Sequence, residues 1–194
     1  MQMEKFSELW RKIFSCSHIK LIKEKLKLQV MAGKNKGLKL IGPKENIRPT
    51  LSRIKEAIFS SISRELVGKS FLDAFCGTGQ MGIEAISRGA SFSMFIDVDT
   101  EIVKKNINKI KLINSDSFKI RKLDLTKNKE MIKTNIAFVD PPYNINLSFL
   151  NFIEFSDFLI LEQHVNTTIA LPENFEIFKE KKYAHTKIYF IERL

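Results

Sequence analysis

The alternation of apolar runs and amphipathic stretches between residues 70 and 164 constrains the fold more than any other feature of this sequence. Short runs rich in β-branched and aromatic residues predict strands at residues 70–75, 91–99, 118–125, 131–142 and 157–164. The stretches between them have helical periodicity and predict helices over residues 80–89, 101–112 and 147–155. Strands that alternate with helices favour an α/β fold, with a parallel sheet covered by helices on its faces.

Both ends of the chain depart from this alternation. Residues 175–194 resemble two strands without an intervening helix, which predicts an antiparallel hairpin at the sheet edge. Residues 26–43 alternate around a Gly/Lys/Asn turn and predict a β-hairpin, and residues 50–63 predict a helix capped by Thr50 or Ser52. We expect three parts: an amphipathic helical extension over residues 1–24, the hairpin and helix over 25–64, and the main domain over 65–194. The extension either docks on the main domain or contacts a membrane surface or RNA.

A glycine-rich turn follows the first predicted strand. Gly77, Gly79 and Gly82 spell G-x-G-x-x-G between that strand and a predicted helix. Glycines let the main chain approach a ligand closely, and the helix N-terminus offers it free N–H groups. Asp73, four residues before Gly77, is a poor neighbour for a pyrophosphate but suits a cationic amino-acid ligand. We interpret the turn as a cofactor site; a purely structural glycine turn is the alternative.

Two further acids mark the ends of the next predicted strands. Asp97 lies 18 residues after Gly79, where a carboxylate can bind ribose hydroxyls. Asp99 competes for that role, although its position also suits a helix cap. Asp124 ends the third predicted strand, where it can accept a hydrogen bond from an adenine amino group. A solvated turn aspartate is the alternative for Asp124.

A buried strand then ends in Asp140, Pro141, Pro142 and Tyr143. Two prolines remove two N–H donors and fix φ, so the turn displays hydrogen-bond acceptors with few competing donors. A flat aromatic face lies beside them. This combination suits an exocyclic amine of a nucleobase, held by two acceptors while its ring stacks on Tyr143. The alternative is a Pro-Pro turn that only closes the strand.

Taken together, the motifs resemble those of Rossmann-like, class I S-adenosylmethionine-dependent methyltransferases. The order and spacing of that class are matched by four segments, "DAFCGTG", "FIDVD", "KLDL" and "FVDPPY". In that class, the acid-Pro-Pro-aromatic motif is used by enzymes that methylate amino nitrogens in DNA, RNA and protein glutamine. The segments "VMAGKNKGLKL" and "RPTLSRIKEAIF" narrow the resemblance to the RsmD family, which methylates the N2 amine of one guanine in bacterial 16S ribosomal RNA. The resemblance extends from about residue 26 to the C-terminus. It implies a mostly parallel seven-stranded sheet with an antiparallel C-terminal hairpin.

The resemblance also implies roles for individual residues. S-adenosylmethionine would be bound by Asp73, Phe75, Cys76, Gly77, Gly79, Asp97, Asp124 and Thr50. Catalysis would involve Asp140, Pro141, Pro142 and Tyr143. Arg48, Thr50, Arg53 and Glu56 match the family's N-terminal signature, near the cofactor or the RNA. Ala32-Gly33 and Gly37-Leu38 stand where the family usually has Gly-Gly and Gly-Arg, so an arginine expected to contact phosphate is absent.

The net charge of +10 suggests a polyanionic partner, although a lysine-rich proteome would produce the same balance. We expect 16S ribosomal RNA, or the assembling small subunit, to contact the hairpin and helix. The candidate RNA-binding residues are Lys34, Lys36, Lys39, Arg48 and Arg53, for which a solvated basic face is the alternative. The competing functions are a methyltransferase for adenine N6 or protein glutamine, an NAD(P)-linked oxidoreductase, and an inactive RNA-binding module.

The remaining expectations concern the cell and the assembly. Cys16 and Cys76 have no metal-ligand spacing and no disulfide framework, which fits a reducing cytoplasm and predicts no metal site. No apolar run approaches the length of a membrane span and no signal-peptide core is present, so we expect no membrane association. A monomer is the default expectation.

Overall fold

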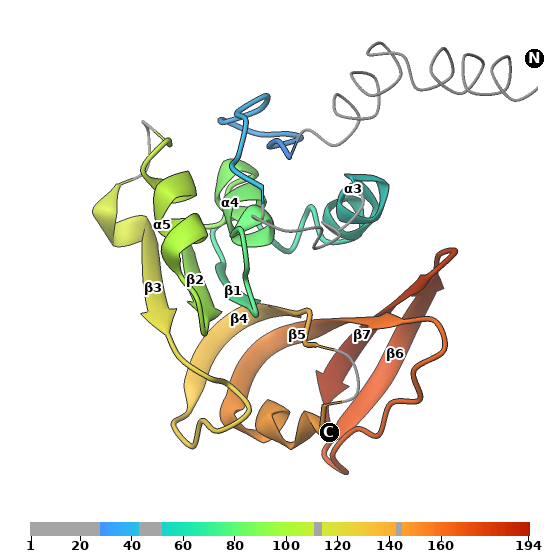
Figure 1. Cartoon of the computed structure of the whole chain (residues 1–194). Coiled ribbons are helices and arrows are strands. Elements are labelled where there is room, and N and C mark those ends of the chain that lie inside the picture. Colours follow the sequence, from blue (N-terminus) through green and yellow to red (C-terminus); the bar gives the residue numbers. More distant parts are fainter. Residues whose placement is uncertain (1–27, 43–51, 111–113, 143–144) are drawn as a thin grey trace, which may run out of the picture.

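The computed structural model describes residues 28–42, 52–110, 114–142 and 145–194. Seven strands form one sheet in the order β3-β2-β1-β4-β5-β7-β6 (Figure 1). The strands are β1 (Ser70–Ala74), β2 (Phe92–Asp97), β3 (Phe118–Lys122), β4 (Ile132–Val139), β5 (Ile153–His164), β6 (Phe175–Lys182) and β7 (Thr186–Arg193). The helices are α3 (Ser52–Ser61), α4 (Gln80–Ser87) and α5 (Glu101–Ile107), with 3-10 turns η1 (Ser115–Ser117) and η2 (Leu147–Phe152). The first five strands are mutually parallel and the last two pair antiparallel, so the predicted fold class is confirmed.

The sheet separates two apolar layers, and strand alternation decides which residues enter each. Phe71, Phe138 and Ile160 pack against α3 and α4 on one face. Their chain neighbours, such as Leu72 and Val139, pack against η2 on the other face. Figure 1 shows α3, α4 and α5 together on one side of the sheet. Burial of both faces explains why the central strands are almost continuously apolar.

Several element boundaries differ from the sequence prediction; for example, the helix expected over residues 101–112 ends at Ile107. The helix expected over residues 147–155 is wrong in its last three residues, since the 3-10 turn η2 ends at Phe152 and β5 begins at Ile153. Ile153 pairs with Ile132 of β4 and is fully buried, so sheet pairing prevails over helical spacing in this apolar run. The third strand ends at Lys122, two residues before Asp124.

The predicted N-terminal hairpin is present in reduced form. Gln29 and Lys39 form a single antiparallel bridge. The hairpin tip lies against the C-terminal end of α4, where the Lys34 N–H donates to the Ser87 carbonyl at 2.8 Å. A Cβ on Gly33 would lie 1.7 Å from that same oxygen, so a glycine is required for the close approach.

A buried charge cluster fixes the hairpin to α4. Glu84 is fully buried and accepts hydrogen bonds from the N–H groups of Met31 at 2.8 Å and Ala32 at 3.0 Å. Its carboxylate also pairs with Lys55 Nζ at 3.3 Å and Arg88 Nε at 2.8 Å. The hairpin is therefore attached to the helix that carries the glycine turn at its other end.

Three predicted site residues, Arg48, Thr50 and Tyr143, lie outside the described residues, and so does the helix predicted within residues 1–24. Within the part that is described, no helix has both the length and the apolar character needed to cross a membrane.

Candidate active site

The strand order places a topological switch between β1 and β4. The chain runs from β1 outward to β2 and β3, then returns to the opposite side of β1 with β4. The connections after β1 and β4 therefore diverge and leave a crevice at the carboxyl ends of these strands, where open α/β sheets bind ligands. The glycine turn follows β1 and Asp140 follows β4, so both motifs lie at this crevice. The Asp140 N–H points to the Ala74 carbonyl at 3.4 Å, which brings the two motifs into contact.

The glycine turn contains two glycines with a left-handed backbone, and the space around these two glycines differs. Gly77 and Gly79 have φ values of +51° and +76°. A Cβ on Gly79 would lie 2.4 Å from Val103 Cγ2, so this glycine permits α4 and α5 to pack. A Cβ on Gly77 would meet nothing within 4 Å, so its surface is open. The non-glycine residue Phe75 also has a positive φ, +59°, a strained conformation of the kind found at functional turns.

Two carboxylates hold the glycine turn in place. Asp97 Oδ2 accepts a hydrogen bond from the Gly77 N–H at 2.8 Å, and its other oxygen accepts from Asp99 N–H at 3.1 Å. Asp73 is 2% exposed and accepts from the Gly82 N–H at 2.8 Å in the first turn of α4. The sequence predicted a ligand role for both acids, and the structure adds a role in fixing the main chain. A carboxylate oxygen has lone pairs for more than one donor, so both roles are compatible.

Asp140 is partly exposed at the end of β4, while Pro141 is buried and Pro142 is exposed. Burial raises the pKa of Asp140 to about 6. The pKa of Asp73 is raised well above its ordinary value by burial and by the negative charges of Asp140 and Asp97, against the opposing effect of the Gly82 hydrogen bond. No lysine or arginine of the described segments forms an ion pair with these three acids. The crevice is therefore an electronegative site that favours a cationic ligand.

The other predicted cofactor residues lie around the same edge with different environments. Cys76 is buried, and burial raises the pKa of its thiol, so it is an inert packing residue rather than a nucleophile. The Phe75 ring packs edge-to-face against Phe149 with centroids 5.4 Å apart. Asp124 accepts hydrogen bonds from the Thr126 hydroxyl at 2.6 Å and the Thr126 N–H at 3.1 Å, and the hydroxyl bond is the main cause of its lowered pKa.

Asp99, the competitor for the ribose position, has the geometry of a helix cap. Its Oδ1 accepts from the N–H of Glu101, the first residue of α5, at 3.0 Å. Asp97, by contrast, points to the glycine turn.

The predicted RNA-binding residues that the structure describes lie at the surface, and two of them lie far from the glycine turn. Lys34, Lys36, Lys39 and Arg53 are exposed. The hairpin tip with Lys34 and Lys36 lies at the C-terminal end of α4, about 10 Å from the glycine turn at 1.5 Å per helical residue. These lysines are thus separated from the crevice by the length of α4.

Asn106 is a site residue that the sequence interpretation missed. It is fully buried, donates to the carbonyls of Thr78 at 2.8 Å and Ile41 at 3.0 Å, and accepts from the Ile41 N–H at 2.6 Å. It thereby joins the end of the hairpin to the glycine turn. The sequence did contain an indication of this role. Asn106 lies three residues after Val103 on the apolar face of the predicted helix, and an amide on such a face is expected to be buried and hydrogen-bonded.

Comparisons with known proteins identify relatives over most of the chain. The family described as Conserved hypothetical protein 95 matches residues 28–192. Ribosomal RNA small subunit methyltransferase D of Buchnera aphidicola subsp. Acyrthosiphon pisum is 32% identical over 167 residues, covering 80% of this chain and 87% of the relative. The protein of that name from Escherichia coli K12 is 28% identical over 167 residues, covering 79% and 84%.

Two solved structures share the fold. A putative methyltransferase from Escherichia coli superposes with a TM-score of 0.71 at 23% identity, covering 85% of this chain and 97% of its own. A putative methylase from Haemophilus influenzae has a TM-score of 0.69 at 24% identity, covering 87% and 99%. The fold, together with the family and its relatives, identifies a class I methyltransferase. Within that class, the chain belongs to the RsmD family.

Proposed function

We propose that this protein transfers a methyl group from S-adenosylmethionine to the exocyclic N2 amine of a guanine in 16S ribosomal RNA. The observation that carries the proposal is the contact between the turn after β1 and the Asp140 turn after β4 at the switch point. A cofactor turn and an acceptor turn are thereby neighbours, as direct transfer between two bound groups requires. The relatives named as small-subunit ribosomal RNA methyltransferases support the choice of RNA.

The residues of the crevice fit this cofactor. The open surface over Gly77 leaves room for a ligand against the main chain. The carboxyl groups of Asp73, Asp97 and Asp140 would face a ligand that carries an ammonium and a sulfonium group, and its positive charge would favour their ionised forms. We assign the amino-acid end to Asp73, Phe75, Cys76, Gly77 and Gly79, the ribose to Asp97, and the adenine to Asp124, and we include Thr50 among the cofactor-binding residues. When bound, the cofactor supplies an activated methyl group.

The acceptor side depends on Asp140 and the prolines. The Asp140 carboxylate and the Pro141 carbonyl accept hydrogen bonds from the two hydrogens of the guanine amine, whose lone pair is delocalised into the ring. Acceptors placed there stabilise the pyramidal nitrogen that develops during transfer more than the planar ground state. The two prolines add no N–H donor that would compete for these acceptors. Tyr143 completes the site by stacking on the base.

The basic residues of the N-terminal region complete the RNA contact. We assign Arg48 and Arg53 to phosphates near the target nucleotide. Lys34 and Lys36 lie at the other end of α4, so they would contact a more distant part of the RNA. An extended, charged contact of this kind makes binding salt-dependent.

The test has a cofactor arm and an acceptor arm. Calorimetric titration of the full chain with S-adenosylhomocysteine should give saturable binding, and NAD should give none; the reverse result would overturn the proposal. For the acceptor, 16S ribosomal RNA and small subunits from a strain lacking the gene are incubated with the protein and S-adenosylmethionine. Mass mapping should then show one new N2-methylguanine. A methylated adenine or a methylated protein glutamine would assign the enzyme to another acceptor.

A further inference from the structure

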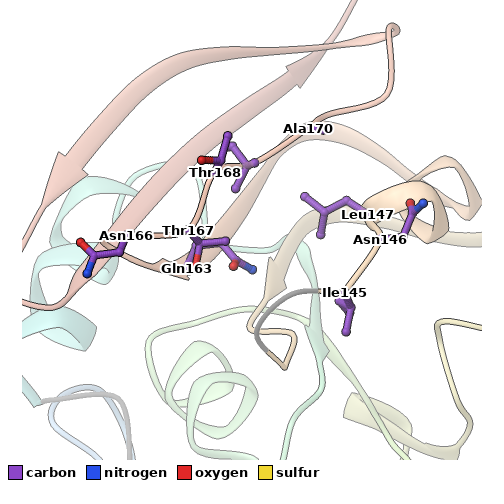
Figure 2. A pocket seen from close by; sticks show the side chains of 9 residues that line it. Ile145, Asn146, Leu147, Gln163, Asn166, Thr167, Thr168 and Ala170 are labelled. Carbon is purple, nitrogen blue, oxygen red and sulfur yellow. The ribbon is translucent and has the colours of Figure 1, made fainter.

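A cleft of about 490 Å³ lies beside the acceptor turn, between the segments that follow β4 and β5. One wall is formed by Ile145, Asn146 and Leu147, and the other by Gln163 with residues 166–170. Figure 2 shows the two walls facing each other, with the side chain of Gln163 directed into the space between them. A volume of this size is typical of a small-molecule site and exceeds the needs of a single hydrogen-bonding group.

The register of the sheet places this cleft on the far side of Asp140 from the glycine turn. Val139 pairs with Leu161, and Gln163 lies two residues beyond Leu161. Because β4 lies between β1 and β5, the carboxyl edge presents the glycine turn, then Asp140, then the cleft. Among the described residues, neither Asp140 nor the two prolines line the cleft. It is therefore a neighbour of the acceptor turn rather than a part of it.

Gln163 is the one buried polar residue among the described residues that line the cleft. Its side chain is 96% buried, since only 4% of the residue is exposed. Within the described segments, its amide forms no hydrogen bond, whereas almost all buried polar groups in proteins are paired. Its main chain belongs to the β5–β7 ladder, so the backbone does not need the amide. The residue is nine-tenths buried and its amide borders the cleft, so a bound molecule can supply the hydrogen-bond partner that the described protein groups do not.

The composition of the walls defines the ligand class. Not one of the nine lining residues is charged, which disfavours a phosphate or a carboxylate. The Gln163 amide presents a donor and an acceptor side by side, as the edge of a nucleobase requires, and Thr167 and Thr168 add hydroxyl groups. Ile145 and Leu147 on the facing wall offer apolar contact to the flat face of a ring.

We propose that the cleft binds an unstacked nucleobase adjacent to the target nucleotide, with Gln163 hydrogen-bonding its edge. This proposal rests on the proposed function, because it takes the target guanine to lie at Asp140. Recognition of single-stranded RNA commonly uses bases that are splayed out of the stack and read at their edges. The cleft would then select the sequence around the target, while the basic residues bind the backbone.

The test uses Gln163→Leu, a substitution of similar size, with Asn151→Leu as the control at an exposed amide on η2. Removal of an unpaired buried amide should leave the melting temperature unchanged or raise it. Affinity for S-adenosylhomocysteine should stay the same, and affinity for the RNA fragment that mass mapping identifies should fall about tenfold, the effect of losing roughly one good hydrogen-bonded contact. Asn151→Leu should change none of these quantities. A drop in melting temperature with unchanged RNA affinity would show that Gln163 is structural, and would overturn the proposal.

A set of RNA fragments, each lacking one base, identifies the occupant. For one flanking position, loss of the base should weaken binding to the wild type and remove the difference between the wild type and Gln163→Leu. If the two effects are independent at every flanking position, or if they couple only at the target guanine, the proposal is wrong.

A direct measurement does not depend on methyl transfer or on the variant. The side-chain amide signals of Gln163 in the wild-type protein should shift on titration with a nucleoside monophosphate and should stay unchanged with inorganic phosphate. Unchanged signals with all four nucleotides would overturn the proposal. If the amide shifts but mass mapping shows no methylguanine, the proposed function fails and the nucleobase site stands.

Discussion

Gly77 and Gly79 lie two residues apart in the same turn, yet alanine should change stability and ligand binding to different extents at the two positions. In Gly79→Ala the new methyl group would lie 2.4 Å from Val103 Cγ2, well inside the carbon–carbon contact distance of about 3.5–4.0 Å. Overpacking costs about 1–3 kcal/mol, and the positive φ costs about another 1–2 kcal/mol. We expect Gly79→Ala to lose about 2–5 kcal/mol of unfolding free energy. Gly77→Ala meets no atom and should lose only the backbone cost, about 1–2 kcal/mol.

Binding of S-adenosylhomocysteine should separate the two positions again. The methyl group of Gly77→Ala projects into the open surface where we place the ligand, so we expect at least a tenfold loss of affinity in a protein that remains folded. Gly68→Ala is the matched control, because it has a φ of +76° with open space around it and lies outside the crevice. Denaturant unfolding and calorimetric titration provide the two measurements. If Gly77→Ala binds the ligand with the affinity of Gly68→Ala, the ligand does not lie over Gly77.

Four further predictions follow from the site and its supports. Glu84→Gln should lower the unfolding free energy by about 3–5 kcal/mol in denaturant titrations, because it breaks a buried ion cluster and leaves its cationic partners uncompensated. Asp140→Asn should abolish methyl transfer in a radiolabel assay but retain S-adenosylhomocysteine binding; loss of both would assign Asp140 to the cofactor. Replacing Lys34 and Lys36 with glutamine should reduce the slope of log affinity against log salt by about 1–2 in filter binding, whereas Lys133→Gln should leave it unchanged. S-adenosylmethionine binding should strengthen as pH rises from 5 to 7.

The position of the crevice could be predicted from the sequence because it depends on local patterns. Buried parallel strands are continuously apolar, so the first polar residue after each strand marks a carboxyl end. Asp97 and Asp140 mark the carboxyl ends of their strands, because the buried apolar runs at residues 95–96 of β2 and 136–139 of β4 stop immediately before them. Asp124 does not follow this rule, since β3 is an edge strand with half-exposed side chains. The main chain leaves the sheet after Lys122 and turns at Asp124. No change in apolar content along the sequence marks the end of β3.

The contacts between distant segments could not be predicted in the same way. Glu84 lies on a helix that the sequence indicated, but its hydrogen bonds to Met31 and Ala32 depend on how the hairpin docks. The cleft at Gln163 depends on two loops that follow different strands, and no sequence spacing relates them. In the run over residues 147–155, apolar spacing fits both a helix and a strand, and only pairing with β4 decides between them.

The pH prediction follows from the grouping of Asp73, Asp97 and Asp140 without an ion-paired lysine or arginine among the described residues. Burial and mutual repulsion raise the pKa of Asp73, and burial raises that of Asp140 to about 6, so folding favours their protonated forms. Both acids therefore stabilise the fold most at low pH, and this contribution is lost as pH rises through their folded-state pKa values. A cationic ligand interacts best with the ionised acids, so its binding must release protons near pH 6. Calorimetry in buffers of different ionisation enthalpy should detect that release with S-adenosylmethionine. S-adenosylhomocysteine lacks the sulfonium charge and should release fewer protons; equal release would show that the carboxylates do not sense the sulfonium group.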